Sequence, residues 1–300
     1  MKERKFIIFI NPVSGTKDKI DMRRYLEKKL SENNFPYEIL PTEQSGRYPF
    51  FKNKINTENI TDVIICGGDG TVNQVVSSTT GMKVNIGIIP MGSGNGLAFA
   101  AGIPKDFKKA IRTILAGKGG YIDAFLINGK FSCMLCGLGF DAQVAHEFSR
   151  QTKRGLSTYI KKTIKHFFKA QPYPFQIKTN GITIDTEAFL ISIANSNQFG
   201  NNFTIAPKAS LCDGLLDIVV VNKTGKFNLI LKILKQIRSG KIVNADAPQK
   251  TVHYFQTEKI IITNPGQAPL HIDGEAAETS EYFEIGILPK AFYLLQEMDV

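Results

Sequence analysis

The N-terminal part of the chain alternates between two hydrophobic patterns. Continuous apolar runs, rich in β-branched and aromatic side chains, occur at residues 5–10, 37–40, 62–65 and 84–89. Apolar residues at helical spacing follow the first, third and fourth runs, at 20–30, 72–76 and 97–101. The runs are typical of strands buried on both faces, and the alternation with helices predicts a parallel sheet.

A different pattern follows residues 117–120, Gly-Lys-Gly-Gly, which we interpret as a hinge. Asn128-Gly129 between two apolar runs is typical of a tight β-hairpin. Short strand-like runs then dominate, at 124–127, 131–135, 175–178, 181–184 and 188–194. They predict an antiparallel sheet or sandwich. We therefore expect two domains, residues 1–122 and residues 123–289, with residues 290–300 returning to the first.

Small and polar residues follow three of the predicted parallel strands, at 11–17, 67–70 and 90–96. The carboxyl ends of parallel strands share one edge of the sheet, where open α/β sheets bind ligands. Three such loops on one edge favour a nucleotide site over chance turns. The P-loop and protein-kinase motifs are not found, and residues 92–97 lack the spacing of the dinucleotide fingerprint.

The loop at 67–70, Gly-Gly-Asp-Gly, connects a predicted strand to a predicted helix. Glycines let backbone N–H groups approach a ligand, and a helix N-terminus adds a positive dipole end, so the stretch suits a phosphate. Asp69 would repel that phosphate unless Mg²⁺ or a hydroxyl proton lies between them. A plain tight turn, in which Asp69 caps the helix, is the structural alternative.

Charge and cysteine content narrow the partners and the compartment. The 300 residues carry 37 Lys and Arg against 27 Asp and Glu, a formal net charge of +10, which favours anionic partners. Free thiols, and the lack of a signal-peptide pattern or a membrane-spanning run, lead us to expect a cytoplasmic protein with at most peripheral membrane contact. We interpret the cysteines as buried strand residues rather than metal or redox ligands: Cys66, Cys133, Cys136 and Cys212.

Residues 11–15 (Asn-Pro-Val-Ser-Gly), 67–73 (Gly-Gly-Asp-Gly-Thr-Val-Asn) and 90–95 (Pro-Met-Gly-Ser-Gly-Asn) together resemble the diacylglycerol kinase catalytic domain family. That family includes soluble bacterial lipid kinases and sphingosine and ceramide kinases. The resemblance implies an α/β N-terminal domain with a parallel sheet like that of phosphofructokinases and NAD kinases, and a β-rich antiparallel sandwich as the second domain. It also implies ATP and Mg²⁺ as cofactors. The ATP-binding residues it implies are Asn11, Pro12, Val13, Ser14, Gly15, Thr42, Gly67, Gly68, Asp69, Gly70, Thr71, Val72, Asn73 and Ser93.

The same resemblance implies a catalytic carboxylate in the second half. Residues 273–275, Asp-Gly-Glu, match a family motif whose Glu is a proposed proton acceptor, so Glu275 is the expected base. Asp69 would organise Mg²⁺ and the γ-phosphate, and it is the rival base. In a turn, both carboxylates of residues 273–275 could simply be solvated. Asp141, in the family's Gly-Phe-Asp-Ala, either caps a helix or faces a lipid head group.

A Mg²⁺ site is implied near residue 213. The resemblance assigns the ion to the Asp213 carboxylate and the backbone carbonyls of Ser210 and Leu215, an oxygen-only set that suits this ion. The ion could be structural or catalytic. An ordinary Asp-Gly turn before a strand is the alternative at this position.

The resemblance therefore implies an ATP-dependent lipid kinase that phosphorylates the hydroxyl of a diacylglycerol- or sphingoid-type lipid at a membrane surface. Residues 92–96, Gly-Ser-Gly-Asn-Gly, look closer to the sphingosine-kinase form of this loop. Basic helical patterns at 156–170 and 227–237 are either solvated faces or lipid contacts. An NAD kinase-like kinase of a soluble substrate and a catalytically silent nucleotide-binding regulator stay open, as does a homodimer. A nucleic-acid partner is not expected.

Overall fold

The computed structural model describes residues 4–14, 19–43, 45–46, 48–143, 170–198, 206–223 and 252–297. The chain forms two compact units, unit 1 (Met1–Asp123 and Pro289–Val300) and unit 2 (Ala124–Leu288). Apart from Ala170, the two predicted basic helices lie outside the described residues. Within the described ranges, no helix combines the length and the apolar character needed to cross a membrane.

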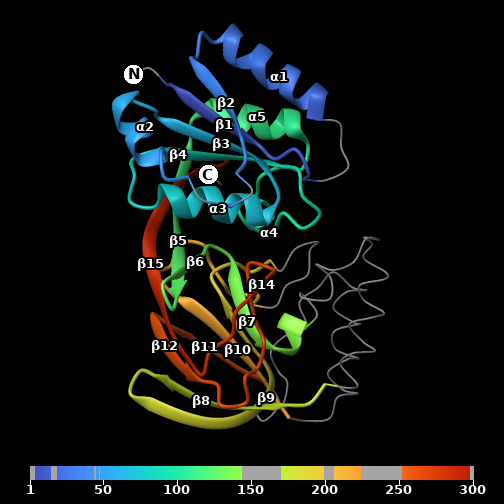
Figure 1. The fold of residues 1–300 in the computed structure, drawn as a ribbon, viewed down its shortest axis with the longest axis vertical. Helices are drawn as coiled ribbons and strands as arrows, with labels where there is room; N and C mark the ends of the chain where they lie inside the picture. Colours follow the sequence, from blue (N-terminus) through green and yellow to red (C-terminus); the bar gives the residue numbers. More distant parts are fainter. Residues whose placement is uncertain are drawn as a thin grey trace. The chain divides into compact units, whose positions relative to one another are not determined.

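Unit 1 is built on a parallel sheet with the strand order β2-β1-β3-β4-β15 (Figure 1). These strands are β1 (Phe6–Ile10), β2 (Tyr37–Pro41), β3 (Asp62–Gly67), β4 (Asn85–Pro90) and β15 (Tyr282–Leu295). β3 is buried throughout, because helices cover both faces of the sheet. The register pairs Ile8 with Ile39 on one side and with Ile64 on the other, so the strands end along a common edge. The predicted parallel sheet is confirmed.

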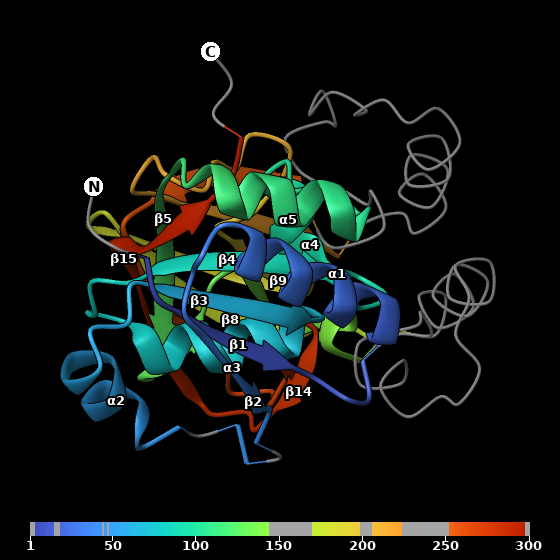
Figure 2. The ribbon, with the colours of Figure 1, turned by 90° about the horizontal axis from the view of Figure 1, so that it is seen from above.

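The helices α1 (Lys19–Glu32) and α5 (Phe107–Ala116) lie on one face of this sheet (Figure 2). Their buried residues, such as Leu26 and Ile111, share a core with Phe6 and Ile64 of the strands. Phe107–Ala116 forms a helix on this sheet because its apolar residues recur at the spacing of one helix face. The helical pattern at 20–30 predicted α1, whereas α5 was not predicted.

The opposite face of the sheet is covered by α2 (Phe51–Thr57) and α3 (Asp69–Thr79) (Figures 1 and 2). The Phe51 ring of α2 packs edge-on against Phe9 of β1, with ring centroids 5.3 Å apart. α3 buries Val72, Val75 and Val76. The short helix α4 (Gly96–Ala100) follows β4, as its pattern predicted, while α2 was not predicted.

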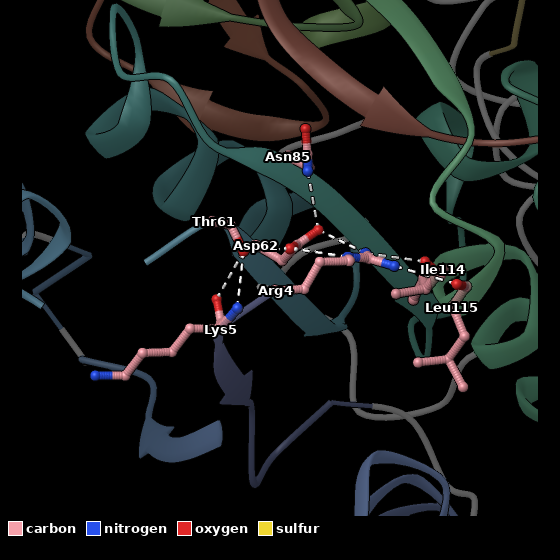
Figure 3. A network of polar contacts seen from close by, with 7 residues as sticks. All are labelled: Arg4, Lys5, Thr61, Asp62, Asn85, Ile114 and Leu115. Atoms are coloured by element: carbon pink, nitrogen blue, oxygen red, sulfur yellow. Dashed lines mark hydrogen bonds and ion pairs between the residues drawn. The ribbon is translucent and has the colours of Figure 1, made fainter. Parts of the chain in front are cut away.

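The amino ends of the strands are fastened by a buried ion pair (Figure 3). Arg4 donates from Nη2 and Nε to the two carboxylate oxygens of Asp62, at 2.6 and 3.0 Å, and the Asp62 side chain is fully buried. Arg4 also donates to the carbonyls of Ile114 and Leu115, both at 3.1 Å, near the C-terminus of α5. Asn85 donates to the same carboxylate at 3.0 Å. One guanidinium therefore joins β3 and α5 at the edge opposite the glycine loops.

Unit 2 is an antiparallel β sandwich, as predicted. Its strands other than β15 are β5 (Gly119–Ile127), β6 (Lys130–Ser132), β7 (Leu135–Gly139), β8 (Tyr173–Thr179), β9 (Ile182–Ala194), β10 (Leu216–Asn222), β11 (Val252–Thr257), β12 (Lys259–Thr263), β13 (Leu270–Ile272) and β14 (Glu275–Ala277). The first part of β9 pairs with β8, and its last part pairs with β7 and β10. β9 therefore belongs to two groups of strands around one core, which includes Phe125, Ile177, Ile191 and Ile218.

Three predictions concern the turns and strand ends of this region. Asn128 and Gly129 have φ values of 47° and 76° and join β5 to β6, as expected for a tight hairpin. The predicted strands at 181–184 and 188–194 are one continuous strand, β9. At the predicted hinge of residues 117–120, Gly117 ends α5 with a φ of 69° and β5 begins at Gly119, and the hinge itself stays a prediction.

Replacing Arg4 by Ala should lower the free energy of unfolding by about 3 kcal/mol, because the buried Asp62 carboxylate would lose its charged partner. Lys5→Ala is the matched control. The Lys5–Glu58 pair is partly exposed, at 34% and 36% of the two side chains, so its loss should cost less than about 1 kcal/mol. Urea unfolding followed by circular dichroism measures both variants. Equal losses would show that the Arg4 network does not fasten this edge.

Candidate functional site

The loops after β3 and β4 touch each other through their backbones. A Cβ built on Gly92 would lie 2.5 Å from the Cα of Gly68, and a Cβ built on Gly68 would lie 3.0 Å from the Cα of Gly92. Real side chains do not tolerate a contact of 2.5 Å with backbone, so Gly92 requires glycine, and a side chain at Gly68 would be tightly packed. The Met91 N–H donates to the Gly67 carbonyl at 2.9 Å and carries the strand pairing into these loops. Two of the three predicted loops are therefore in contact.

Asp69 lies at this junction. Gly68 occupies the N-cap position of α3 and Asp69 is the first residue of the helix, so Asp69 does not serve as the cap. A Cβ on Gly94 would lie 2.7 Å from Asp69 Oδ2, which places the carboxylate against the loop after β4. A negative charge in the first turn of a helix is stabilised by the helix dipole. The same position offers a carboxylate to a cation or to a proton.

A hydrogen bond between side chains fastens the loop after β1 to the same turn. Asn11 Nδ2 donates to Thr71 Oγ1 at 2.7 Å, and the Asn11 N–H donates to the Cys66 carbonyl at 3.0 Å. Asn11 Oδ1 accepts from the N–H of Val13 at 2.9 Å, which shapes the loop itself. Two residues of the predicted nucleotide site, Asn11 and Thr71, thus hold two of its loops together.

Asn95 closes the loop after β4, and the sequence analysis did not single it out. Its Oδ1 accepts from the Gly92 N–H and its Nδ2 donates to the Gly92 carbonyl, both at 2.8 Å. Asn95 has a φ of 55°, in the left-handed region that Asn tolerates better than most residues. An Asn flanked by glycines was the available signal. Ser93, the residue predicted in this loop, is exposed.

The other predicted nucleotide-binding residues follow the sheet edge or lie in α3. They are Pro12, Val13 and Ser14 after β1, Thr42 after β2, and Gly70, Val72 and Asn73 in α3. Val13 is 85% exposed, whereas the Val72 side chain is buried in the core, so Val72 could reach a ligand only through its backbone. Gly15 lies outside the described residues.

In unit 2, the predicted base lies on a tight β-hairpin. β13 and β14 pair antiparallel, and the connecting Asp273 and Gly274 have φ values of 47° and 84°. Glu275 is the first residue of β14 and is exposed. Asp273, in contrast, is only 5% exposed. The alternative of a solvated turn is therefore wrong for Asp273, and the two carboxylates differ in environment.

Asp273 anchors this hairpin to the segment between β6 and β7. Its Oδ1 accepts from the Ser132 hydroxyl at 2.6 Å and from the N–H groups of Met134 and Leu135 at 3.1 and 3.0 Å. Its Oδ2 accepts from the Cys133 N–H at 3.2 Å. Buried backbone N–H groups need such partners, so Asp273 has a structural function in the turn that carries Glu275.

Asp141 faces an imidazole. Its Oδ2 lies 3.4 Å from Nε2 of the fully buried His271, and its Oδ1 accepts from the Ala142 N–H at 2.9 Å. The structure thus adds a buried histidine that the sequence analysis did not mention. No short-range pattern could have found it, because Asp141 and His271 are far apart in the sequence.

The predicted Mg²⁺ ligands lie in the turn before β10. The exposed Asp213 carboxylate accepts from the Leu215 N–H at 3.1 Å and from Gln256 Nε2 at 3.3 Å. Burial raises the pKa of the neighbouring Asp217, against the lowering effect of hydrogen bonds from Tyr254 and Gln256. Among the described residues, no three His, Cys, Asp or Glu gather as a metal cluster. One carboxylate with carbonyl oxygens is still a donor set that a hard cation accepts when water completes it.

Three of the four cysteines are buried, as predicted, and Cys212 is exposed, contrary to the prediction. Cys66 and Cys136 lie in strands, while Cys133 lies between β6 and β7. Burial, followed by the nearby Asp273 and Asp141 carboxylates, raises the pKa of the Cys136 thiol well above its usual value. Burial also raises the pKa of Cys66. Both thiols stay protonated, which suits core residues rather than metal ligands.

Gly92→Ala should lower the free energy of unfolding by about 2 kcal/mol, because the new methyl group would overlap the Gly68 backbone. Gly120→Ala is the control, since its Cβ would have only an ordinary contact of 3.6 Å with Gln296. This control should change stability by less than about 1 kcal/mol. Urea unfolding compares the two. An unchanged Gly92→Ala midpoint would contradict the close approach of the loops.

Comparisons with known proteins agree with this architecture. A family model of the diacylglycerol kinase catalytic domain matches residues 5–127. A second model, the YegS C-terminal NAD kinase beta sandwich-like domain, matches residues 135–296. A solved structure of a diacylglycerol kinase from Bacillus anthracis covers 99% of this chain and 98% of its own, with a TM-score of 0.76 at 20% identity. That likeness shows a shared fold.

Curated relatives extend over most of the chain. A "Probable lipid kinase YegS-like" of Shewanella frigidimarina is 27% identical over 269 residues, which cover 87% of this chain and 85% of the relative. A diacylglycerol kinase of Staphylococcus carnosus is 26% identical over 279 residues, which cover 92% and 89%. Because the two family models match successive ranges that correspond to the α/β part and the sandwich, the chain belongs to the diacylglycerol kinase catalytic domain family, with a C-terminal domain of the YegS type.

Proposed function

We propose that this protein is a lipid kinase that transfers the γ-phosphoryl group of ATP to the hydroxyl of a diacylglycerol- or sphingoid-type lipid. The observation that carries the proposal is the backbone contact between Gly68 and Gly92 beside the N-terminus of α3. It gathers glycine-rich backbone at the edge of a parallel sheet where nucleotides bind. Membership of the diacylglycerol kinase catalytic domain family supports the same function.

In this proposal the loops of unit 1 hold ATP. Residues 67–71 and 92–95 offer backbone N–H groups to the phosphates, and the start of α3 adds its positive dipole end. The Asn11–Thr71 hydrogen bond keeps the loop after β1 in register with this site. Asp69 alone would repel the phosphates; it would instead be a ligand for Mg²⁺, which when bound would neutralise phosphate charge.

Glu275 is the proposed base. The lipid hydroxyl oxygen attacks the γ-phosphorus, its proton passes to the Glu275 carboxylate, and ADP leaves. The exposure of Glu275 leaves its carboxylate open to a substrate, whereas the donors around Asp273 commit that acid to the turn. In this proposal Asp273 therefore has a structural function and Glu275 a chemical one.

A second Mg²⁺ is proposed at Asp213, with the carbonyls of Ser210 and Leu215. The hydrogen bond from the Leu215 N–H to Asp213 Oδ1 folds the turn so that carboxylate and following backbone lie close together. The donors are oxygen atoms at an exposed position, where water can complete the coordination. An ion there would order the turn that leads into β10.

Labelled ATP, offered with vesicles that contain diacylglycerol, sphingosine, ceramide or monoacylglycerol, should give a phosphorylated lipid with the wild-type protein. Glu275→Gln should lower kcat on the order of 10²-fold or more, since an amide cannot accept the proton. Asp69→Asn should reduce activity similarly if it organises the ion. Glu278→Gln, at another exposed acid two residues beyond Ala276, is the control and should stay near wild type.

The same assay separates the alternatives. Phosphorylation of NAD but of no lipid would favour a soluble-substrate kinase. A wild-type rate that neither Asp69→Asn nor Glu275→Gln lowers would favour a nucleotide-binding regulator without catalysis. A normal Glu275→Gln rate together with an inactive Asp69→Asn would instead make Asp69 the base.

A further inference from the structure

The hairpin that carries Glu275 contains a buried imidazole with no function in the proposal above. His271 lies in β13, opposite Ala276 of β14 and opposite Gly137 of β7, and it is 0% exposed. A fully buried histidine is costly unless its ring nitrogens are used. Its position four residues before Glu275, on the other arm of the hairpin, makes its contacts relevant to that carboxylate.

The two ring nitrogens of His271 have different surroundings. Nδ1 accepts from the N–H of Gly274 at 3.3 Å, so this nitrogen carries no proton. In a neutral ring the proton then sits on Nε2, which faces Asp141 Oδ2 at 3.4 Å. The imidazole thus stands between the Asp273–Gly274 peptide, one residue before Glu275, and the carboxylate of Asp141.

Gly137 makes room for this arrangement. A Cβ at Gly137 would lie 1.9 Å from Asp141 Oδ2 and 2.7 Å from His271 Nε2. No side chain can therefore occupy the position beneath the pair. The Asp141 carboxylate and the edge of the His271 ring occupy the space that a side chain at Gly137 would need.

We propose that His271 is a positioning residue for Glu275. Asp273 fixes one end of the turn through the donors around its carboxylate, and His271 accepts the Gly274 N–H from the other side. On the far side of the ring, Nε2 lies 3.4 Å from Asp141 Oδ2. Gly274 has a φ of 84°, in the left-handed region that favours glycine. This inference rests on the proposed function, in which Glu275 must meet a hydroxyl within hydrogen-bond reach.

Three substitutions separate the contacts of the two nitrogens. His271→Asn keeps an acceptor at the Nδ1 position, His271→Gln keeps a donor near the Nε2 position, and His271→Phe keeps neither. We expect His271→Asn to retain kcat within about threefold, and the other two to lose on the order of 10- to 100-fold, because small displacements of a reacting group cost this much. The KM for ATP should not change. His253→Asn, at an exposed histidine of β11, is the control and should match wild type.

Amide hydrogen exchange of Gly274, measured without substrate, tests the positioning independently of activity. The exchange should be slow in wild type and His271→Asn, and faster in His271→Gln and His271→Phe. Unchanged exchange in His271→Phe, a wild-type kcat in His271→Gln, or an equal loss in His271→Asn and His271→Phe would overturn the inference. If wild type phosphorylates no lipid, the proposed function fails, and the exchange data alone decide whether His271 holds the turn.

Discussion

The contact between the Gly68 and Gly92 backbones is the constraint on which the site depends. Parallel pairing of β3 with β4 brings the two loops to one edge, but only the lack of side chains allows them to touch. Asp69 then rests against Gly94. The opposite edge is closed by the charged network around Arg4. The sheet is thus held together at the amino ends of its strands, where Asp62 is buried. At their carboxyl ends it presents backbone groups to a ligand.

Much of unit 1 could be predicted, because its strands are continuous apolar runs and its loops are rich in glycine. The helix Phe107–Ala116 was not predicted, although its buried residues lie on one face. Asn95 was missed for a physical reason. Its function is a pair of hydrogen bonds to Gly92 that only the folded loop shows. The structural alternative, in which Asp69 caps the helix, is wrong because Gly68 occupies the N-cap position.

Unit 2 was less predictable, because its contacts join residues far apart in the sequence. The Asn128-Gly129 hairpin was predicted because the turn chemistry is local. The length of β9 was not, since polar residues between its apolar parts suggested a break that pairing with β8 overrides. The burial of Asp273, and the His271–Asp141 pair, depend on strands that the sequence cannot align. Motif matching assigned 273–275 as a unit, and the environments of its two acids separate them.

The most direct test of the central claim is a crystal structure with a non-hydrolysable ATP analogue and Mg²⁺. Because Gly68 and Gly92 bring their loops into contact, we expect the analogue's phosphates to accept hydrogen bonds from backbone N–H groups of residues 67–71 and 92–95. The Asp69 carboxylate should face the metal. A triphosphate bound away from both loops, or crystals that take up no nucleotide at saturating concentration, would contradict the account.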